Sequence, residues 1–496
     1  QVVVVLEPKT AVRLQERCGS GKIPAAEAVE VLFPGMKLSE RKTLAMVFEL
    51  ASAGGGAPVP RPEITRRYKG AGRALHSLAG LDLVELEEHR VFRDPFGRQL
   101  QFFPVPEKLT REQDLVLEQL LPAVRDPAFQ AFLLHGITGC GKTEVYLRCA
   151  AEALAQGRSV LVLVPEIALA SQIEAHFYSR FGDRLAVLHS GLSSAERHDQ
   201  WQRIISGAAR GVIGARSAVF APLVRPGLII VDEEHEPAYK QEDGLRYNGR
   251  DLAVLRARFA GCPVILGSAT PSVTSYHHAL SGKYRLLEMH RRIHDQSLPL
   301  VQVINLAENR PSRPDLCFSD QLISALWENM DQRQQSLVFI NRRGFASFMM
   351  CRDCGHIMQC RHCQVSLTLH RRQQNLVCHY CGYTLTSRVV CPSCSSPKME
   401  GMGLGAERIE EEVRQLIPHA RVARLDSDAV ASRKQYIDVL QAVQRREIDI
   451  LVGTQMIAKG LHFPNMTLVG VVWADSGLGM PDFRASERTF QLLAQV

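Results

Sequence analysis

A glycine-rich segment at residues 136–143 has the composition of a phosphate-binding loop. It follows an apolar run at 132–134 and precedes a stretch with helical spacing, which is the context that the pattern G-x-x-x-x-G-K-[ST] requires. We predict that its backbone N–H groups surround the phosphates of a nucleotide, that Lys142 contacts the β- and γ-phosphates, and that Thr143 binds Mg²⁺. The residues given this role are Gly136, Thr138, Gly139, Cys140, Gly141, Lys142 and Thr143.

Two carboxylates follow the apolar run at 228–231. Asp232 is positioned to hold Mg²⁺ through water, and Glu233 is positioned to polarise the attacking water as a general base. Acidic residues after a strand are often no more than a helix cap. Together with the glycine-rich loop, however, they predict hydrolysis of a nucleoside triphosphate, with Lys142, Asp232 and Glu233 as the catalytic residues.

Eight of the 13 cysteines form four C-x-x-C pairs between residues 351 and 394. Eight thiolates are enough for two tetrahedral Zn²⁺ sites. The spacing suggests a nested arrangement, with an inner zinc ribbon and an outer site that closes the base of the segment. An iron–sulfur cluster uses the same ligands but is less favoured, and clustered pairs argue against a disulfide framework. The predicted ligands are Cys360, Cys363, Cys378 and Cys381 for the inner site, and Cys351, Cys354, Cys391 and Cys394 for the outer site.

Continuous apolar runs predict the strands that carry these residues. Buried parallel strands have this pattern, and helical stretches lie between most of the runs. We therefore expect an α/β protein with two parallel-sheet lobes, at 105–292 and at 293–496, the second interrupted by the zinc-binding insertion at 351–397. The runs of the first lobe lie at 132–134, 160–164, 185–188, 228–231 and 264–266; the second set begins near Val301 and includes 337–340, 448–452 and 467–473.

The segment before the first lobe predicts a smaller module. Three short helical stretches at about 39–51, 62–68 and 73–78 are followed by two alternating strands at 83–87 and 91–93. This is the order of a winged helix, so residues 38–104 are assigned to one, with DNA contact through Arg73, His76 and Ser77. A protein-binding or packing role is the alternative. Residues 1–37 are expected to be a linker from a domain that precedes this chain.

Composition excludes several classes of protein. The chain has 496 residues, 46% of them apolar and 22% charged, which is typical of globular proteins and not of fibrous or disordered ones. No apolar run approaches the roughly 18 residues of a membrane span, so we expect no membrane partner and a cytoplasmic location. The net charge of +7 is weakly in favour of an anionic partner. The chain begins at Gln1 and is expected to be an internal portion of a longer protein.

The ordered series of motifs resembles the superfamily 2 helicases, with RecA-like lobes. Further motifs of that superfamily stand at 164–167, 189–191, 214–217, 267–271, 339–344 and 453–460. The resemblance implies that Gly267–Thr270 couples hydrolysis to strand movement. It also implies that Gln113 reads adenine, and that Pro165, Arg216, Ser217 and Asn341 lie along the single-strand track.

Within that superfamily the chain is similar to the bacterial replication-restart helicases. The resemblance rests on Asp232–His235, Tyr239–Gln241, Arg246-Tyr247, Asn341–Phe345 and the four C-x-x-C pairs. It implies an ATP-dependent 3′-to-5′ DNA helicase that recognises branched or stalled forks and initiates primosome assembly. The implied cofactors are ATP, Mg²⁺ and two Zn²⁺. The implied partners are branched and single-stranded DNA, primosome proteins and the single-strand DNA-binding protein.

The chain departs from that family in three places. Leu245 stands where the family usually has Trp, Cys140 replaces a Ser of the phosphate loop, and the chain stops before the motif that carries the arginine finger. We expect Arg246 and Tyr247 to link DNA engagement to hydrolysis.

Two other functions stay open from the sequence. One is a non-catalytic scaffold that recognises forks, against which the intact Lys142, Asp232 and Glu233 argue. The other is an ATP-driven translocase that does not separate strands, which would share every motif.

Overall fold

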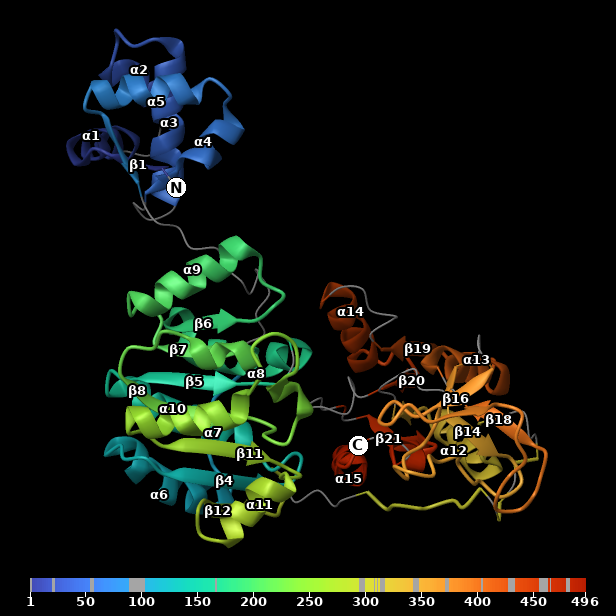
Figure 1. Ribbon diagram of the computed structural model, residues 1–496. Helices are drawn as coiled ribbons and strands as arrows, with labels where there is room; N and C mark the ends of the chain where they lie inside the picture. Colours follow the sequence, from blue (N-terminus) through green and yellow to red (C-terminus); the bar gives the residue numbers. More distant parts are fainter. Residues whose placement is uncertain are drawn as a thin grey trace. The chain divides into compact units, whose positions relative to one another are not determined.

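The computed structural model divides the chain into two compact units, Gln1–Asp94 and Pro95–Val496 (Figure 1). Each unit is described by itself. The structure describes residues 2–19, 23–53, 58–88, 103–165, 167–293, 299–306, 308–309, 311–312, 317–341, 348–370, 374–402, 405–426, 433–454, 463, 465–478 and 482–496.

In its described residues, the N-terminal unit packs five helices with a three-stranded antiparallel sheet of order β2-β1-β3. Its hydrophobic core joins Leu14 and Val29 to Leu44, Ile64 and Leu75. The elements in chain order are β1 (Val2–Leu6), α1 (Pro8–Gly19), α2 (Ala25–Leu32), α3 (Leu38–Ala53), β2 (Val59–Pro60), α4 (Arg61–Arg67), α5 (Ala71–Gly80) and β3 (Val84–Glu88).

The expectation that residues 1–37 form a linker is wrong. Strand β1 is the central strand of the sheet, paired with β3 from Val2↔Glu88 to Leu6↔Val84. Helices α1 and α2 contribute buried residues to the same core as α3 and α5. The partner of β1 lies some 80 residues downstream, so nothing near the apolar run in the sequence reveals the pairing. Val3 and Val4, in the middle of the apolar run, are buried in the N-terminal unit.

The winged-helix assignment stays a prediction. Helices α3, α4 and α5 followed by β3 have the expected order, but the second strand of the hairpin, at 91–93, lies outside the described residues. Arg73, His76 and Ser77 are exposed on α5, although the Ser77 hydroxyl also donates to Glu40 Oε1 at 2.8 Å. Contact of this face with DNA is likewise still a prediction.

The first lobe of the second unit contains a seven-stranded parallel sheet of order β12-β4-β11-β8-β5-β7-β6. Alternate strand residues enter two separate cores, one on each face, which explains why the strands are apolar throughout. The elements are α6 (Arg111–Arg125), β4 (Ala131–Gly136), α7 (Lys142–Ala155), β5 (Ser159–Leu163), α8 (Ile167–Phe181), β6 (Leu185–Leu188), α9 (Ser194–Ile205), β7 (Gly211–Gly214), β8 (Pro226–Val231), α10 (Gly249–Ala260), β11 (Val264–Ser268), α11 (Val273–Leu280) and β12 (Arg285–Met289).

The second lobe contains a four-stranded parallel sheet of order β19-β20-β13-β21. The prediction of two parallel-sheet lobes is thus confirmed, although residues 299–305 near Val301 form no strand. None of the helices described is both long and apolar enough to span a membrane. The elements are α12 (Asp320–Asp331), β13 (Gln335–Ile340), α13 (Ala406–Leu416), β19 (Val422–Leu425), α14 (Arg433–Gln444), β20 (Ile450–Gly453), β21 (Met466–Val472) and α15 (Ala485–Gln495).

The cysteine-rich segment folds as a five-stranded antiparallel sheet of order β17-β16-β15-β14-β18. Strands β14 and β18 pair from Phe348↔Met402 to Cys351↔Met399, so the insertion leaves and re-enters the lobe through adjacent strands. Its strands are β14 (Phe348–Cys351), β15 (Thr368–His370), β16 (Asn375–Val377), β17 (Thr384–Thr386) and β18 (Met399–Met402).

Candidate nucleotide site and metal centres

The phosphate loop connects the end of β4 to the start of α7. Gly139 and Gly141 have φ of +83° and +88°, a conformation that residues with a side chain rarely adopt. The Lys142 ammonium group donates to the carbonyl oxygen of Gly136 at 2.7 Å, across the loop. Helix α7 begins at Lys142, so its unpaired N–H groups and the positive end of its dipole point toward the loop. The loop therefore has the backbone and the cation that a polyphosphate needs.

Gln113 lies against this loop. Thr110 and Gln113 form a capping box at the start of α6, in which Gln113 Oε1 accepts from the Thr110 N–H at 2.9 Å. The amide Nε2 of Gln113 donates to the carbonyl of Gly141 at 3.3 Å. The side chain predicted to read adenine thus lies beside the phosphate loop, and adenine recognition stays a prediction.

Sequence reasoning missed a second segment that lies against the loop. Residues after β12 cross the loop, and the Ile293 N–H donates to the carbonyl of Gly139 at 3.0 Å. The side chain of Arg292 lies over Gly139, where an added Cβ would meet its Cγ at 3.7 Å. No motif marks this segment, because its position depends on the β12–β4 pairing.

Asp232 and Glu233 lie at the carboxyl edge of the same sheet, where α/β proteins bind their ligands. Asp232 is buried and accepts a hydrogen bond from the Tyr146 hydroxyl at 2.9 Å. Burial and, to a smaller extent, the nearby charge of Glu233 together raise the pKa of Asp232 to about 7, against the opposing effect of Lys142. The carboxylate therefore lies in a region that favours a bound cation.

Glu233 is held in an unusual backbone conformation, with φ of +45°. Its Oε2 accepts from Gln495 Nε2 at 3.2 Å, and the same amide lies 3.2 Å from His235 Nε2. His235 Nδ1 lies 2.7 Å from the hydroxyl of Ser268, the last residue of β11. A side chain from the second lobe is therefore in direct contact with the proposed general base.

Helix α15 supplies a second glutamine to the first lobe. Gln491 Nε2 donates to the carbonyl of Thr270 at 3.3 Å. Gln491 and Gln495 are four residues apart and so lie on one face of the helix. Sequence reasoning assigned neither residue. Two glutamines spaced four residues apart in this helix were the signal that could have revealed them.

The predicted single-strand residues fall in three places. Pro165 is buried at the end of β5, and Asn341 follows β13 in the second lobe, next to Gly477. Arg216 and Ser217 open a short 3-10 helix, Arg216–Phe220, and Arg216 Nη1 donates to the carbonyl of Ala238 at 3.0 Å and also to that of Lys240. The motif residues 342–344 and 455–460 lie outside the described residues. DNA contact by these residues remains a prediction.

Arg216 is hydrogen-bonded to the backbone at the base of the loop that carries Arg246 and Tyr247. Strands β9 (Lys240–Gln241) and β10 (Tyr247–Asn248) form a hairpin whose tip carries the exposed Leu245 and Arg246. The ring of Tyr247 packs edge-on against Phe220, with the ring centroids 5.1 Å apart. Arg246 is therefore free to reach a ligand, whereas Tyr247 is partly committed to packing.

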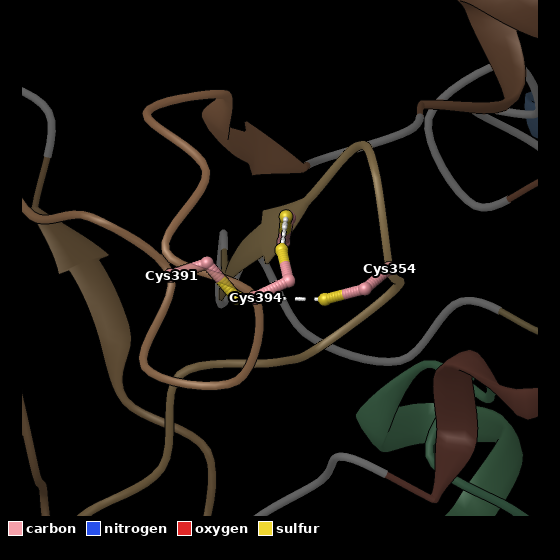
Figure 2. A group of neighbouring side chains, drawn as sticks. Cys354, Cys391 and Cys394 are labelled. Atoms are coloured by element: carbon pink, nitrogen blue, oxygen red, sulfur yellow. Dashed lines mark hydrogen bonds between the residues drawn. The ribbon is translucent and has the colours of Figure 1, made fainter.

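The eight cysteines form two groups of four, as the nested pairing predicts. In each group the four Sγ atoms lie within 4.8 Å of one another. The outer group includes Cys351–Cys394 and Cys354–Cys391 Sγ distances of 3.6 and 3.4 Å, and Figure 2 shows Cys354, Cys391 and Cys394 converging. Thiolates at 2.3 Å from a tetrahedral Zn²⁺ would lie about 3.8 Å apart, so these groups fit the ion.

The inner group has the same geometry, and its four Sγ atoms are likewise close enough together to bind one metal ion. Cys360 and Cys381 Sγ atoms are 3.6 Å apart. A hydrogen bond from the Cys381 backbone N–H is the main cause that lowers the pKa of the Cys378 thiol to about 7, whereas a hydrogen bond with the Cys381 thiol is the main cause that raises the pKa of Cys363 to about 12. The metal-binding thiolate is therefore favoured at Cys378. Four thiolates leave no open coordination position, so both centres are structural.

The first lobe resembles the DEAD/DEAH box helicases in its fold and in this site. The family model described as "DEAD/DEAH box helicase" matches residues 110–278. A helicase domain of this class uses ATP with Mg²⁺, and the two Cys₄ groups account for two Zn²⁺ ions.

The chain is a relative of the replication restart protein PriA. The family model "PriA DNA helicase Cys-rich region (CRR) domain" matches residues 360–385. Replication restart protein PriA of Bacillus subtilis is 42% identical over 93% of this chain and 57% of its own length. The PriA proteins of Synechocystis and Chlamydia pneumoniae are 40% and 38% identical over 99% of this chain, and over 58% and 65% of their own lengths. The chain thus spans between 57% and 65% of the length of these relatives.

Proposed function

We propose that this chain is the ATP-driven motor of a replication restart helicase. It would hydrolyse ATP, move 3′ to 5′ along single-stranded DNA, separate strands at branched or stalled forks, and initiate primosome assembly. The observation that carries the proposal is the contact of Gln495 with Glu233, which links the second lobe to the hydrolysis site. Similarity to the PriA proteins supports the fork and the primosome as the context.

The residues of the first lobe have separate roles in the proposed hydrolysis. Bound Mg²⁺ would supply charge neutralisation at the phosphates. Lys142 would orient the β- and γ-phosphates, and the Thr143 hydroxyl with the Asp232 carboxylate would hold the cation. Glu233 would accept the proton of the attacking water. Because Glu233 is hydrogen-bonded to Gln495, its readiness as a base would depend on the position of the second lobe.

DNA engagement is proposed for a surface that begins at Arg216. Its guanidinium is bonded to the backbone of the hairpin that presents Arg246. Arg246 would contact a phosphate, and Pro165, Ser217, Tyr247 and Asn341 would complete the single-strand track. The winged-helix candidate and the zinc insertion would engage the branch, and the insertion would also offer a surface to partner proteins.

The proposed partners follow from the proposed restart role. Primosome proteins and the single-strand DNA-binding protein would be its partners, and the protein would act in the cytoplasm. The residues that would dock these partners are not assigned.

Two assays test the proposal. ATP hydrolysis should be stimulated by forked and single-stranded DNA, and the protein should displace a strand from a fork with ATP but not with a non-hydrolysable analogue. Binding to forks without hydrolysis would instead indicate the scaffold. Hydrolysis and movement without strand displacement would indicate the translocase.

A further inference from the structure

The carboxylate of Glu234 is fully buried at the end of β8, next to the general base. Its side chain has 0% exposure, and it accepts four hydrogen bonds. The donors are Arg250 Nη1 at 3.0 Å, the Ser272 N–H at 2.6 Å, the Ser272 hydroxyl at 3.1 Å and the Ser275 hydroxyl at 2.7 Å. A buried charge is retained only with such complete pairing, because an unpaired one is costly.

These donors fix the segment that follows β11. Ser272 caps α11, since its hydroxyl accepts from the Ser275 N–H at 3.2 Å. The other end of the segment is held by the contact of Ser268 with His235. Between these two anchors lies Thr270, whose carbonyl accepts from Gln491 of the second lobe. Glu234 therefore determines the position of a segment that contacts both the carboxylate strand and the second lobe.

Arg250 connects the same carboxylate to the hairpin that carries Arg246. It stands in the first turn of α10, directly after β10, and Asn248 caps that helix by accepting from the Arg250 N–H at 3.0 Å. The neighbouring Gly249 packs on Arg216, where an added Cβ would meet Arg216 Cγ at 3.1 Å. A displacement of Arg216 or of the hairpin would therefore act directly on the partner of Glu234.

We propose that Glu234, paired with Arg250, is a positioning residue that couples DNA engagement to ATP hydrolysis. The pair holds the 268–272 segment and the first turn of α10 in one arrangement beside Glu233. Neither side chain bonds to the phosphate loop, so the pair acts through Glu233 and Thr270 and not through nucleotide binding. The inference rests on the proposed DNA-stimulated hydrolysis.

Three variants test this role against a matched control. E234Q removes the charge with little change of shape, R250A removes its partner, and S275A deletes one donor with the least risk to folding. The control is R256A, on the same helix α10, because Arg256 is also partly buried but binds the carbonyls of Val219 and Ala221 instead of Glu234. Each protein is assayed for melting temperature, KM for ATP, and hydrolysis with and without single-stranded DNA.

A positioning role predicts that DNA stimulation of hydrolysis falls while KM for ATP hardly changes. In E234Q and R250A the ratio of DNA-stimulated to basal hydrolysis should fall about tenfold, as loss of a hydrogen bond to a charged group implies. S275A should show a smaller fall, R250K should recover part of the R250A loss, and KM for ATP should stay within about twofold. R256A should have a lower melting temperature than the wild type but the same ratio of DNA-stimulated to basal hydrolysis.

The outcomes separate this inference from the proposed function. The positioning role alone would be overturned if DNA stimulated E234Q and S275A as much as the wild type. It would also be overturned if R256A lost as much of the ratio of DNA-stimulated to basal hydrolysis as E234Q and R250A. A wild-type protein that DNA does not stimulate would overturn the proposed function, and the positioning role with it.

Discussion

The hydroxyl of Tyr146 donates a hydrogen bond of 2.9 Å to Oδ1 of Asp232, and both residues are buried. Tyr146 belongs to α7, the helix that begins at the phosphate loop, so this bond ties the loop's helix to the strand that carries the carboxylates. It also stabilises the charged form of Asp232. Burial and the charge of Glu233 act in the opposite direction and raise the pKa of Asp232 to about 7.

The raised pKa predicts a pH dependence of hydrolysis. Because Asp232 must be ionised to hold Mg²⁺, Mg²⁺-dependent hydrolysis should rise as pH increases through about 7. The hydrogen bond from Tyr146 lowers this pKa, so Y146F should shift the rise to higher pH, by about 0.5 to 1 unit for a bond of about 1 kcal/mol. The measurement is kcat/KM between pH 5.5 and 8.5.

Stability gives an independent check of the same group. The folded pKa of Asp232 is raised above its unfolded value, so the folded protein holds this proton more tightly. Stability from Asp232 should therefore fall as pH rises from about 4 to about 7 in the absence of Mg²⁺. D232N should remove this fall while retaining an oxygen that accepts from Tyr146. An unchanged pH profile in both Y146F and D232N would contradict the assignment.

Gly267 is predicted to be indispensable for the Tyr146 bond. A Cβ at Gly267 would lie 1.6 Å from the Tyr146 hydroxyl, and no rotation of a buried ring relieves such an overlap. G267A should displace Tyr146, raise the apparent pKa for hydrolysis as Y146F does, and cost about 1 to 3 kcal/mol of stability through overpacking. Gly211 is the matched control, because it also lies in a strand of this sheet and an added Cβ makes only contacts of 3.4 Å or more. Equal stability of G267A and the wild type would contradict the prediction.

K142A and E233Q should lose ATP hydrolysis for different reasons. K142A removes the charge at the β/γ-phosphates, so both nucleotide affinity and hydrolysis should fall. E233Q keeps a side chain that can bond to Gln495 but cannot accept a proton, so hydrolysis should fall about 100-fold or more while ATP stays bound. Equilibrium binding of a fluorescent ATP analogue, read beside turnover, separates the two. Near-normal turnover by E233Q would show that another group is the base.

The parts that sequence predicts well are those encoded by local patterns. The loop at 136–143 and the carboxylates at 232–233 follow apolar strands, and the cysteine pairs carry their own spacing. Those patterns led to the two lobes and the two Cys₄ groups, which the structure bears out. The residues that act through such local chemistry are therefore visible without coordinates.

The parts that sequence misses depend on long-range pairing. Val2–Leu6 looks like a stray apolar run because its partner strand ends at Glu88. Gln495 reaches Glu233 from 262 residues away, and Arg292 reaches the phosphate loop because β12 lies beside β4. Such contacts leave no spacing rule in the chain.

Arg246 is expected to contribute one phosphate contact. It is exposed at the hairpin tip and makes no hydrogen bond or ion pair among the described residues. R246A should weaken single-stranded DNA binding and reduce the slope of log affinity against log salt by about 0.7. R258A is the control, since Arg258 is exposed near the other end of α10. Identical salt slopes for R246A and the wild type would show that Arg246 makes no phosphate contact on the single-strand track.

The double variant R246A/Y247A should lose the DNA stimulation of hydrolysis and keep basal hydrolysis.

The two zinc centres should differ in what their loss disturbs. Cys351 ends β14, which pairs with β18 where the insertion joins the second lobe, whereas Cys378 lies between β16 and β17 in the core of the tip. A closed Cys₄ site supplies folding energy and no reactive water. C378A should therefore unfold mainly the tip, and C351A should also lower the stability of the lobe.

C351A and C378A should also differ in which activities they lose. Each variant should lose about one of the two Zn²⁺ ions, measured by metal analysis of the purified protein. C378A should keep DNA-stimulated hydrolysis, because the tip supplies none of the nucleotide-site contacts found among the described residues, but it should lose strand displacement or partner docking. C351A should lose part of the hydrolysis as well, since Gln491 and Gln495 reach the first lobe from α15 of the lobe that it destabilises. If C378A displaced strands and assembled normally, the tip would be only a stabilising element. If C351A and C378A lost hydrolysis equally, the outer site would have no special link to the lobe.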